Sequence, residues 1–254
     1  WKITLPQLFG EVAAEWWGIA EPDLAVNSLK NYRPAYIRAE RYFHSTPIRS
    51  MKPMHVSQFL KWFADDKKAA EKTVKTQLLV VSLIFKYALT CGYVDSNPAD
   101  GLPVPKGLSK VKREAASPED VQRIKDHVGD PFGLFAYFAL YTGMRRSEIL
   151  ALEWSDIDMR NNAIRISKSI YRDTDGVIKA KEPKTEAGVR VIPLLAGLKK
   201  HLKPAKGLVF PNESGGYITE GSFTARWKRY AKQAGISCTP HEIRHAYATA
   251  LVSS

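Results

Sequence analysis

The sequence has 254 residues, 44% of them hydrophobic and 25% charged, which is typical of a globular protein with a sizeable buried core. Its 38 lysines and arginines outnumber its 26 aspartates and glutamates, so a polyanionic partner is expected, nucleic acid ahead of an anionic membrane. The sequence shows no membrane-spanning run, no signal peptide and no metal-type spacing of Cys91 and Cys238, which favours a reducing cytoplasm. The positive excess is five in residues 1–110 and seven in residues 111–254, so we expect a binding surface that spans two domains.

The first hundred residues predict a helical bundle. Apolar residues recur at helical spacing in four segments, 5–21, 27–43, 55–64 and 69–89. The last segment has the clearest period, formed by Val74, Leu78, Val81, Phe85 and Ala88. We therefore expect a compact all-helical domain over residues 1–103. Basic residues on its helices are candidates for contact with a phosphate backbone, namely Lys30, Arg33, Lys72 and Lys75.

A change of composition marks the domain boundary. Residues 104–116 are rich in proline, glycine, lysine and arginine, as expected of a basic linker between domains. A new helix is then predicted by Ser117-Pro118-Glu119, with serine as the N-cap, proline at the first helical position and an acid in the first turn.

The second domain, residues 117–254, is expected to be α+β with a small antiparallel sheet, which makes the whole chain mainly α with two domains. Helices are predicted over 117–128, 131–141 and 145–153, and again near residues 196, 219 and 240. Strands are predicted over 163–167 and 189–193, with turn residues at 173–176 between them.

Four cationic or titratable residues in this domain suggest one chemistry. Arg145 follows a Thr-Gly break at a helix start, Lys184 lies on a turn before the last strand, and His241 and Arg244 share one face of the final helix. Two guanidinium groups can stabilise the charge of a phosphodiester in its transition state. A lysine can protonate the leaving oxygen and a histidine can handle the nucleophile's proton. No metal or other cofactor is needed, because fixed cations take its place.

These motifs resemble those of the tyrosine recombinases, or phage-type integrases. The run from Thr142 to Asp158 is similar to their first arginine box, Pro183-Lys184-Thr185 to their hairpin lysine, and the run from His241 to Thr249 to their second box. The helical N-terminal domain resembles their SAM-like core-binding domain, so the resemblance covers nearly the whole chain.

The resemblance implies site-specific strand exchange of a mobile element through a 3′-phosphotyrosyl intermediate in a bacterial host. It also implies catalytic roles for Arg145, Lys184, His241 and Arg244, and a supporting buried carboxylate at Glu148. The partner would be double-stranded DNA, to which Arg146 is a further candidate contact. Four protomers would assemble on two sites, with accessory DNA-bending proteins where the element uses them.

The chain departs from the family pattern at its end. The family carries a further His or Trp and then the nucleophilic tyrosine beyond the second box, whereas this chain stops at Ser254. Tyr247 corresponds to an aromatic core position and is expected to pack inward. As given, the chain is therefore expected to bind DNA without cleaving it.

Two other interpretations remain open. His241-Glu242-Ile243-Arg244-His245 also satisfies the HExxH pattern of zinc hydrolases, with two histidines four residues apart and a glutamate as general base. Against it, Arg244 would place a permanent cation beside the zinc. The second alternative is a catalytically inactive, sequence-specific DNA-binding protein that retains the fold.

Overall fold

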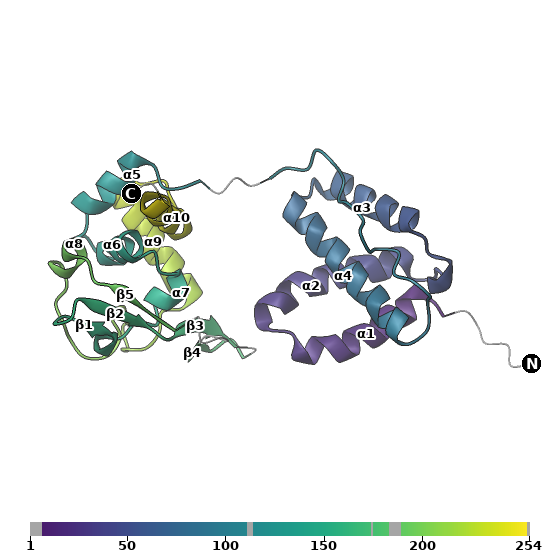
Figure 1. Ribbon diagram of the computed structural model, residues 1–254, viewed down its shortest axis with the longest axis horizontal. Helices are drawn as coiled ribbons and strands as arrows, with labels where there is room; N and C mark the ends of the chain where they lie inside the picture. The colour runs from purple at the N-terminus through teal and green to yellow at the C-terminus, as the bar shows by residue number, and fades with distance from the viewer. Residues whose placement is uncertain (1–6, 111–113, 174, 183–188, 253–254) are drawn as a thin grey trace, which may run out of the picture. The chain divides into compact units, whose positions relative to one another are not determined.

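The computed structural model describes residues 7–110, 114–173, 175–182 and 189–252. For residues 249–252 it describes the backbone only. The chain divides into two compact units, residues 1–112 and 113–254, and the division falls inside the predicted linker. Within the described residues, no helix combines the length and apolar character that crossing a bilayer requires. The two units are coloured by residue number in Figure 1.

The first unit is the expected helical bundle. Its helices are α1 (Phe9–Asp23), α2 (Val26–Phe43), the short 3-10 helix η1 (Ile48–Ser50), α3 (Pro53–Lys67) and α4 (Glu71–Thr90). Helix α4 packs against each of the other three α-helices, as its long apolar period predicts. Aromatic rings from all four α-helices form the centre of the core, and Phe9 lies 5.2 Å from Phe43 and 5.7 Å from Phe85 between ring centroids.

One core position in this unit is polar. Gln77 of α4 is fully buried, where it accepts a hydrogen bond from Nε of Arg38 at 2.9 Å and donates to the carbonyl of Ala35 at 2.8 Å. The pairing satisfies the buried amide and ties α2 to α4. Trp62 of α3 lies at the edge of this core, where it is 43% exposed and packs against the ring of Tyr42.

The second unit has the expected α+β architecture. Its helices are α5 (Pro118–Asp126), α6 (Gly133–Thr142), α7 (Arg146–Ile149), η2 (Trp154–Asp156), α8 (Ala196–Lys199), α9 (Glu220–Ala234) and α10 (Pro240–Val252). Its strands are β1 (Ile157–Asp158), β2 (Ala163–Ile166), β3 (Ser169–Arg172), β4 (Ile178–Lys181) and β5 (Arg190–Pro193). Strands β1, β2 and β5 form one antiparallel sheet in that order, and β3 and β4 form a separate hairpin. The fold class predicted from the sequence is confirmed.

Helix α6 is the centre of the second unit. Five consecutive residues from Phe135 to Ala139 are buried, so the helix is covered on nearly every side. It packs against α5, α7, α8 and α10, and the contact with α10 is the most extensive (Figure 1). This contact brings the two predicted arginine boxes together, because the first begins where α6 ends and the second lies on α10.

The predicted helix over 145–153 is wrong at its C-terminal end. Helix α7 ends at Ile149, and the chain continues as an irregular segment into η2. The backbone of this segment forms hydrogen bonds with residues that are distant in the sequence. The N–H of Trp154 donates to the carbonyl of Gly207 at 2.9 Å, and Glu153 forms a β-bridge with Leu208. Helix α7 is therefore short, and the buried side chains of Met144 before it and Leu150 after it anchor it in the core.

Candidate active site

The turn between α6 and α7 places Arg145. Gly143 ends α6 in the left-handed region at φ +58°, and the Thr142 hydroxyl donates to the Phe138 carbonyl at 2.6 Å and accepts from the Met144 N–H at 3.2 Å. Met144 is 1% exposed and anchors the turn in the core. Arg145 then caps α7 with a side chain that is 63% exposed. The sequence prediction of a fixed arginine at a helix start is consistent with this geometry.

Glu148 orients this arginine. Its carboxylate is buried and accepts from the backbone N–H of Arg145 and from Nη1 of Arg145, both at 2.8 Å. It also accepts from Nη1 and Nη2 of Arg190 on β5, at 3.2 and 2.8 Å. Burial, the largest single influence, would raise the pKa of Glu148, but the hydrogen bonds from Arg190 and Arg145 together outweigh it and hold that pKa below its ordinary value. The carboxylate is therefore ionised at neutral pH.

Arg244 reaches the same turn from α10. Its Nη1 donates to the carbonyl of Gly143, two residues before Arg145. Burial is the main cause that lowers the pKa of Arg244, and the positive charges of Arg145 and Arg190 lower it further against the opposing effect of Glu148. Three guanidinium groups and one carboxylate thus lie within electrostatic reach of one another, with an excess of positive charge suited to an anion.

Tyr247 packs against the same turn. A Cβ atom on Gly143 would overlap Cδ1 of the Tyr247 ring and lie 2.7 Å from Cε1. The inward packing expected from the sequence is confirmed by this contact. It also explains why position 143 holds glycine: the left-handed backbone favours it, and the ring leaves no room for a side chain.

The two histidines of α10 are adjacent. Nε2 of His241 lies 3.1 Å from Nε2 of His245, and the rings meet edge to face with centroids 4.4 Å apart. Glu242 is used elsewhere: its carboxylate accepts from the Thr239 N–H at 2.6 Å, and its own N–H donates to the Thr239 hydroxyl at 3.3 Å, which forms a capping box. Among the described residues there is no cluster of three His, Cys, Asp or Glu side chains that could hold a metal ion. The HExxH pattern thus gains no third ligand in this part of the chain.

Asp120 holds the start of α10 in place. This buried carboxylate accepts from the Ser237 N–H at 3.2 Å, the Ser237 hydroxyl at 3.1 Å and the Cys238 N–H at 3.0 Å. Burial, the largest influence, would raise its pKa, but the hydrogen bonds from Ser237 and Cys238 together lower it. Burial, with the charge of Asp120, raises the pKa of the Cys238 thiol to about 12, so this cysteine is not a thiolate nucleophile at neutral pH.

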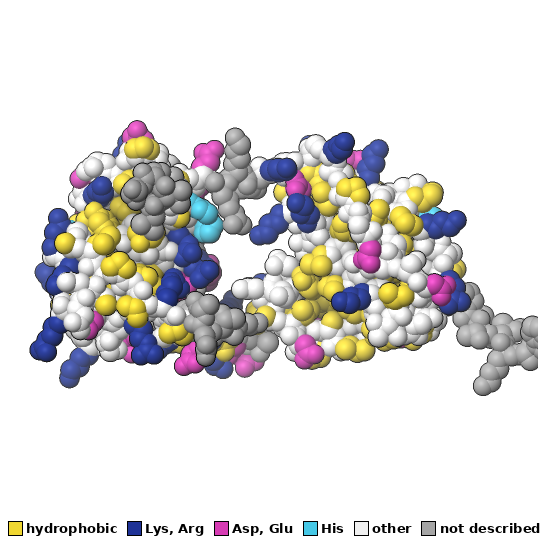
Figure 2. Space-filling model, in the orientation of Figure 1, with side chains coloured by type: hydrophobic (Ala, Val, Ile, Leu, Met, Phe, Trp, Pro, Cys, Tyr) yellow, Lys and Arg dark blue, Asp and Glu magenta, His cyan; other side chains and the backbone are white. Residues whose placement is uncertain are grey.

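The predicted DNA contacts are not gathered at this cluster. Arg146 turns to α9, where it donates to both oxygens of Glu220 at 2.8 and 3.0 Å and covers the ring of Phe223. Four predicted DNA contacts are exposed on the first unit: Lys30 and Arg33 on α2, and Lys72 and Lys75 on α4. Arg33 pairs with Glu21, and Lys75 pairs with Glu71 at 2.6 Å. Lysine and arginine side chains are spread over the visible face of both units in Figure 2. Lys184 lies outside the described residues.

Sequence reasoning missed Arg190 and Asp120. Arg190 could have been found, because strand alternation places it on the same face as Ile192, opposite the exposed Val191, and a charge on the core side of a strand needs a partner. Asp120 follows the N-cap of α5 like an ordinary first-turn acid, and no local signal indicates its partners 117 and 118 residues later.

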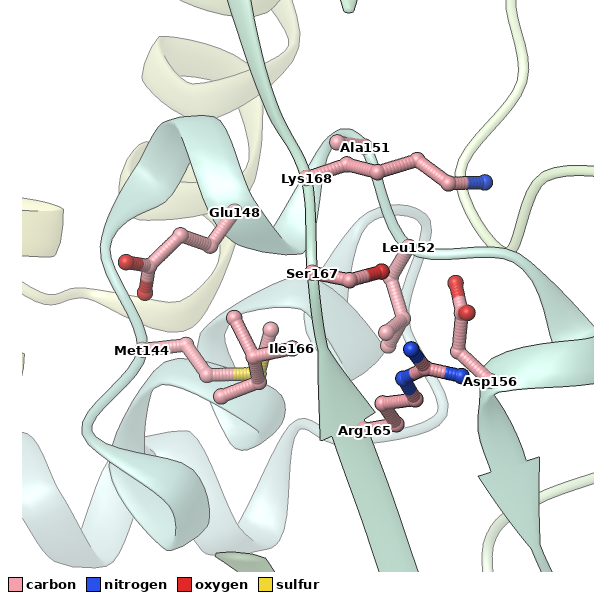
Figure 3. A pocket seen from close by; sticks show the side chains of 9 residues that line it. All are labelled: Met144, Glu148, Ala151, Leu152, Asp156, Arg165, Ile166, Ser167 and Lys168. Carbon is pink, nitrogen blue, oxygen red and sulfur yellow. The ribbon is translucent and has the colours of Figure 1, made fainter. Parts of the chain in front are cut away.

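A shallow cleft lies behind the α7 turn. It is lined by residues of α7 and of the segments on either side of α7, by Asp156 of η2 and by residues 165–168 at the end of β2 (Figure 3). Figure 3 shows the carboxylate of Glu148 and the ammonium of Lys168 on opposite sides of it, and Lys168 pairs with Glu153 at 2.7 Å. The side chains leave no room there for even a water molecule, whereas a pocket for an organic ligand measures about 300–1,000 Å³. The arginine cluster, and not this cleft, is the candidate site.

The fold and the site define a two-domain protein whose second domain gathers arginines at one turn. Residues 117–254 match the family model described as "Phage integrase family", and residues 21–93 match "Phage integrase, N-terminal SAM-like domain". Because the first match alone covers more than half of the chain, the chain belongs to the phage integrase family.

Individual relatives agree with this assignment. The chain is 28% identical over 256 residues to a "Tyrosine recombinase XerC-like" protein of Caldanaerobacter subterraneus subsp. tengcongensis, with 87% of this chain and 65% of the relative covered. It is 22% identical to "Prophage integrase IntR" of Escherichia coli K12, with 97% of this chain and 70% of the relative covered. The chain therefore spans about two thirds of the length of these relatives.

Solved structures share the fold. The Tn1549 transposon integrase in complex with a circular intermediate DNA superposes with a TM-score of 0.82 at 18% identity, covering 97% of this chain and 87% of that one. A lambda integrase tetramer bound to a Holliday junction superposes with a TM-score of 0.68 at 19% identity, covering 96% of this chain and 72% of that one.

The pairing of Glu148 predicts a pH dependence of stability. The groups that face this carboxylate are Arg145, Arg190 and Arg244, all cations. Because its pKa is lowered on folding, its contribution to stability is complete above about pH 4.5 and is lost as the pH falls through the folded-state pKa. We expect the free energy of unfolding to fall more steeply below pH 4.5 in the wild type than in Glu148→Gln. Urea unfolding of both proteins from pH 3 to pH 7 measures this, and parallel curves would contradict it.

Proposed function

We propose that the full-length protein is a site-specific DNA recombinase that integrates or excises a mobile element. The observation that carries the proposal is the hydrogen bond from Arg244 to the Gly143 carbonyl, which brings the arginine of the second box to the turn that holds Arg145. Two guanidinium groups placed in this way suit the non-bridging oxygens of one phosphodiester. Membership of the phage integrase family supports the same reading.

The proposed reaction is a pair of transesterifications. A tyrosine oxygen attacks the scissile phosphorus, the new bond gives a 3′-phosphotyrosine, and the bond to the 5′ oxygen breaks. The 5′ oxygen takes a proton, which we assign to Lys184, while His241 handles the proton of the nucleophile. Attack by the 5′-hydroxyl of the partner strand reverses these steps. The number of phosphodiester-type bonds is unchanged, so strand exchange needs no energy cofactor.

Tyr247 is not the nucleophile in this proposal. Its ring packs against Gly143, and a nucleophile must instead approach the phosphorus in line with the leaving oxygen. Because the nucleophile of the tyrosine recombinases follows the second box, we expect the attacking tyrosine to lie outside residues 1–254. The chain as given would then bind DNA without forming a covalent adduct.

Double-stranded DNA is the proposed partner, and four protomers on two recombination sites the proposed assembly. Support comes from the net charge of +12 and from the structures of the Tn1549 integrase with DNA and of the lambda integrase tetramer on a Holliday junction. Accessory DNA-bending proteins and the cytoplasm of a bacterial host complete the proposal.

The experiment that tests the function uses the full-length protein and DNA fragments that flank its gene. We expect a protein–DNA adduct that survives boiling in detergent, is removed by protease and is linked through a 3′-phosphotyrosine. Tight binding without any adduct would favour the catalytically inactive DNA-binding protein. Stoichiometric zinc in protein purified without chelator would instead favour the metal hydrolase.

The exposed lysines of α4 give a separate prediction about binding. Each phosphate contact releases counterions, so the logarithm of the binding constant falls with the logarithm of salt concentration in proportion to the number of contacts. We expect Lys72→Ala and Lys75→Ala each to reduce the magnitude of this slope by about 1. Fluorescence anisotropy of a labelled duplex at several salt concentrations measures the slope.

Lys61 supplies the matched control, because it is an exposed lysine on α3 that is not among the predicted contacts. Lys61→Ala should retain the wild-type slope. Equal slopes for all four proteins would remove α4 from the proposed binding surface.

A further inference from the structure

Arg190 lies on the core side of β5, where a charged residue is unusual. The pattern of the strand alternates: Arg190 and Ile192 are half-buried, whereas Val191 between them is 66% exposed. Strand β5 pairs with β2 and begins at Arg190, six residues after the predicted Lys184 in the sequence. A guanidinium at this position must find an anion in the interior, and it finds Glu148.

The contact with Glu148 is a symmetric bridge. Oε1 of Glu148 accepts from Nη1 of Arg145 at 2.8 Å and from Nη1 of Arg190 at 3.2 Å. Oε2 accepts from the backbone N–H of Arg145 and from Nη2 of Arg190, both at 2.8 Å. Each carboxylate oxygen thus binds one group from each arginine. Bidentate pairing of this kind fixes the orientation of the carboxylate as well as its charge.

The charges of the cluster depend on this bridge. With Arg145 alone, the single negative charge of Glu148 would cancel the single positive charge of the arginine that faces the solvent. With Arg190 on the other side of the carboxylate, the three groups carry a net charge of +1, and Arg244 adds another within electrostatic reach. The site can therefore retain an excess of positive charge at the exposed guanidinium.

We infer that Arg190 is a positioning residue, which neutralises and orients Glu148 so that the guanidinium of Arg145 is fixed in place with its charge available to a phosphate. Both terminal nitrogens of Arg190 bind Glu148, so we assign Arg190 to the carboxylate and not to the phosphate. Arg145 is different: its side chain is 63% exposed, and within the described residues only its Nη1 is used on the carboxylate. The inference rests on the proposed function and adds a residue to its machinery.

The test compares Arg190→Met and Arg190→Lys in the full-length protein. We expect Arg190→Met to slow covalent adduct formation by about 10- to 100-fold, the range seen when a group that orients a ligand is removed. Affinity for the duplex should stay within about threefold, since the phosphate contacts elsewhere are retained. Arg190→Lys keeps the positive charge but loses the bidentate hydrogen bonding of the guanidinium, so it should react faster than Arg190→Met and more slowly than the wild type. Arg165→Met is the matched control, an exposed arginine opposite Val191 on β2 that should react at the wild-type rate.

A double-mutant cycle separates this role from a general loss of stability. If Arg190 acts through Glu148, adding Arg190→Met to a Glu148→Gln protein should cost less than about threefold in rate, because the group it positions is already gone. A merely structural arginine would cost the same factor in both backgrounds. Wild-type rates for Arg190→Met, or full additivity in the cycle, overturn the inference.

A second measurement does not require strand cleavage. Inorganic phosphate is titrated into the chain of residues 1–254 while the side-chain Nε–Hε signals of Arg145 and Arg244 are followed by NMR. We expect Arg190→Met to weaken phosphate binding at these signals by threefold or more, and an unchanged dissociation constant overturns the inference. If the full-length wild-type protein forms no covalent adduct, the proposed function fails. The phosphate titration still decides whether Arg190 positions Glu148.

Discussion

Replacing Arg244 with alanine in the full-length protein is expected to slow covalent adduct formation by about 10²- to 10³-fold, the cost of removing one preorganised donor to a developing oxyanion. The guanidinium is half-buried at the α6–α7 turn, where it binds the Gly143 carbonyl and lies within electrostatic reach of Arg145. Affinity for the duplex should change far less, because binding draws on many exposed cations. Adduct yield against time on a recombination site, with anisotropy for binding, measures both quantities.

Two variants control this experiment. Arg244→Lys keeps a positive charge but cannot bind the carbonyl and a phosphate in one plane, so it should remain impaired. Arg229→Ala removes an exposed arginine from α9, on the same unit, and should leave the rate unchanged. An Arg244→Ala protein that reacts within tenfold of the wild type would exclude Arg244 from the reaction.

Gly143→Ala is expected to destabilise the second unit by about 3 kcal/mol. The left-handed backbone accounts for about 1 kcal/mol of this, and forcing a methyl group into a packed contact costs about 1–3 kcal/mol more. The methyl group would overlap the ring of Tyr247, which would have to move away from the turn that holds Arg145. The same variant should therefore lower adduct formation as well as the free energy of unfolding in urea.

Gly235→Ala separates the two contributions. Gly235 also ends a helix in the left-handed region, at φ +66°, but a Cβ atom there would meet no atom within 4 Å. Its loss of stability should be about 1 kcal/mol, from the backbone alone. Equal losses for Gly143→Ala and Gly235→Ala would mean that the Tyr247 ring moves aside without cost.

Sequence reasoning succeeded where the signal is local. Ser117 caps α5 as predicted, because an N-cap, a proline and an acid within a few residues define the start of a helix. The four α-helices of the first unit were found from apolar spacing, with ends displaced by at most four residues. Arg145 was placed at a helix start for the same reason, because the Thr-Gly break before it is visible in the sequence.

It failed where a backbone or side chain is satisfied by a distant partner. The predicted helix over 145–153 is wrong beyond Ile149, because the N–H of Trp154 donates to the carbonyl of Gly207 instead of to a residue of the helix. The bidentate pairing of Arg146 with Glu220, 74 residues later, carries no local signal, while its contact with DNA stays a prediction. Strands β3 and β4 were missed, although the turn between them was recognised.

The hydrogen bonds between Asp120 and the segment that precedes α10 have a consequence for folding during synthesis. The helices of the first unit can complete their mutual contacts once α4 has been synthesised, so this unit can fold before the second leaves the ribosome. In the second unit, Asp120 can form its hydrogen bonds only after Ser237 and Cys238 have been synthesised. Arg244 comes later still in the sequence. Until α10 emerges, the nascent chain exposes Arg145 and Glu148 without Arg244. Assembly of the arginine cluster is thus delayed until α10 has been synthesised.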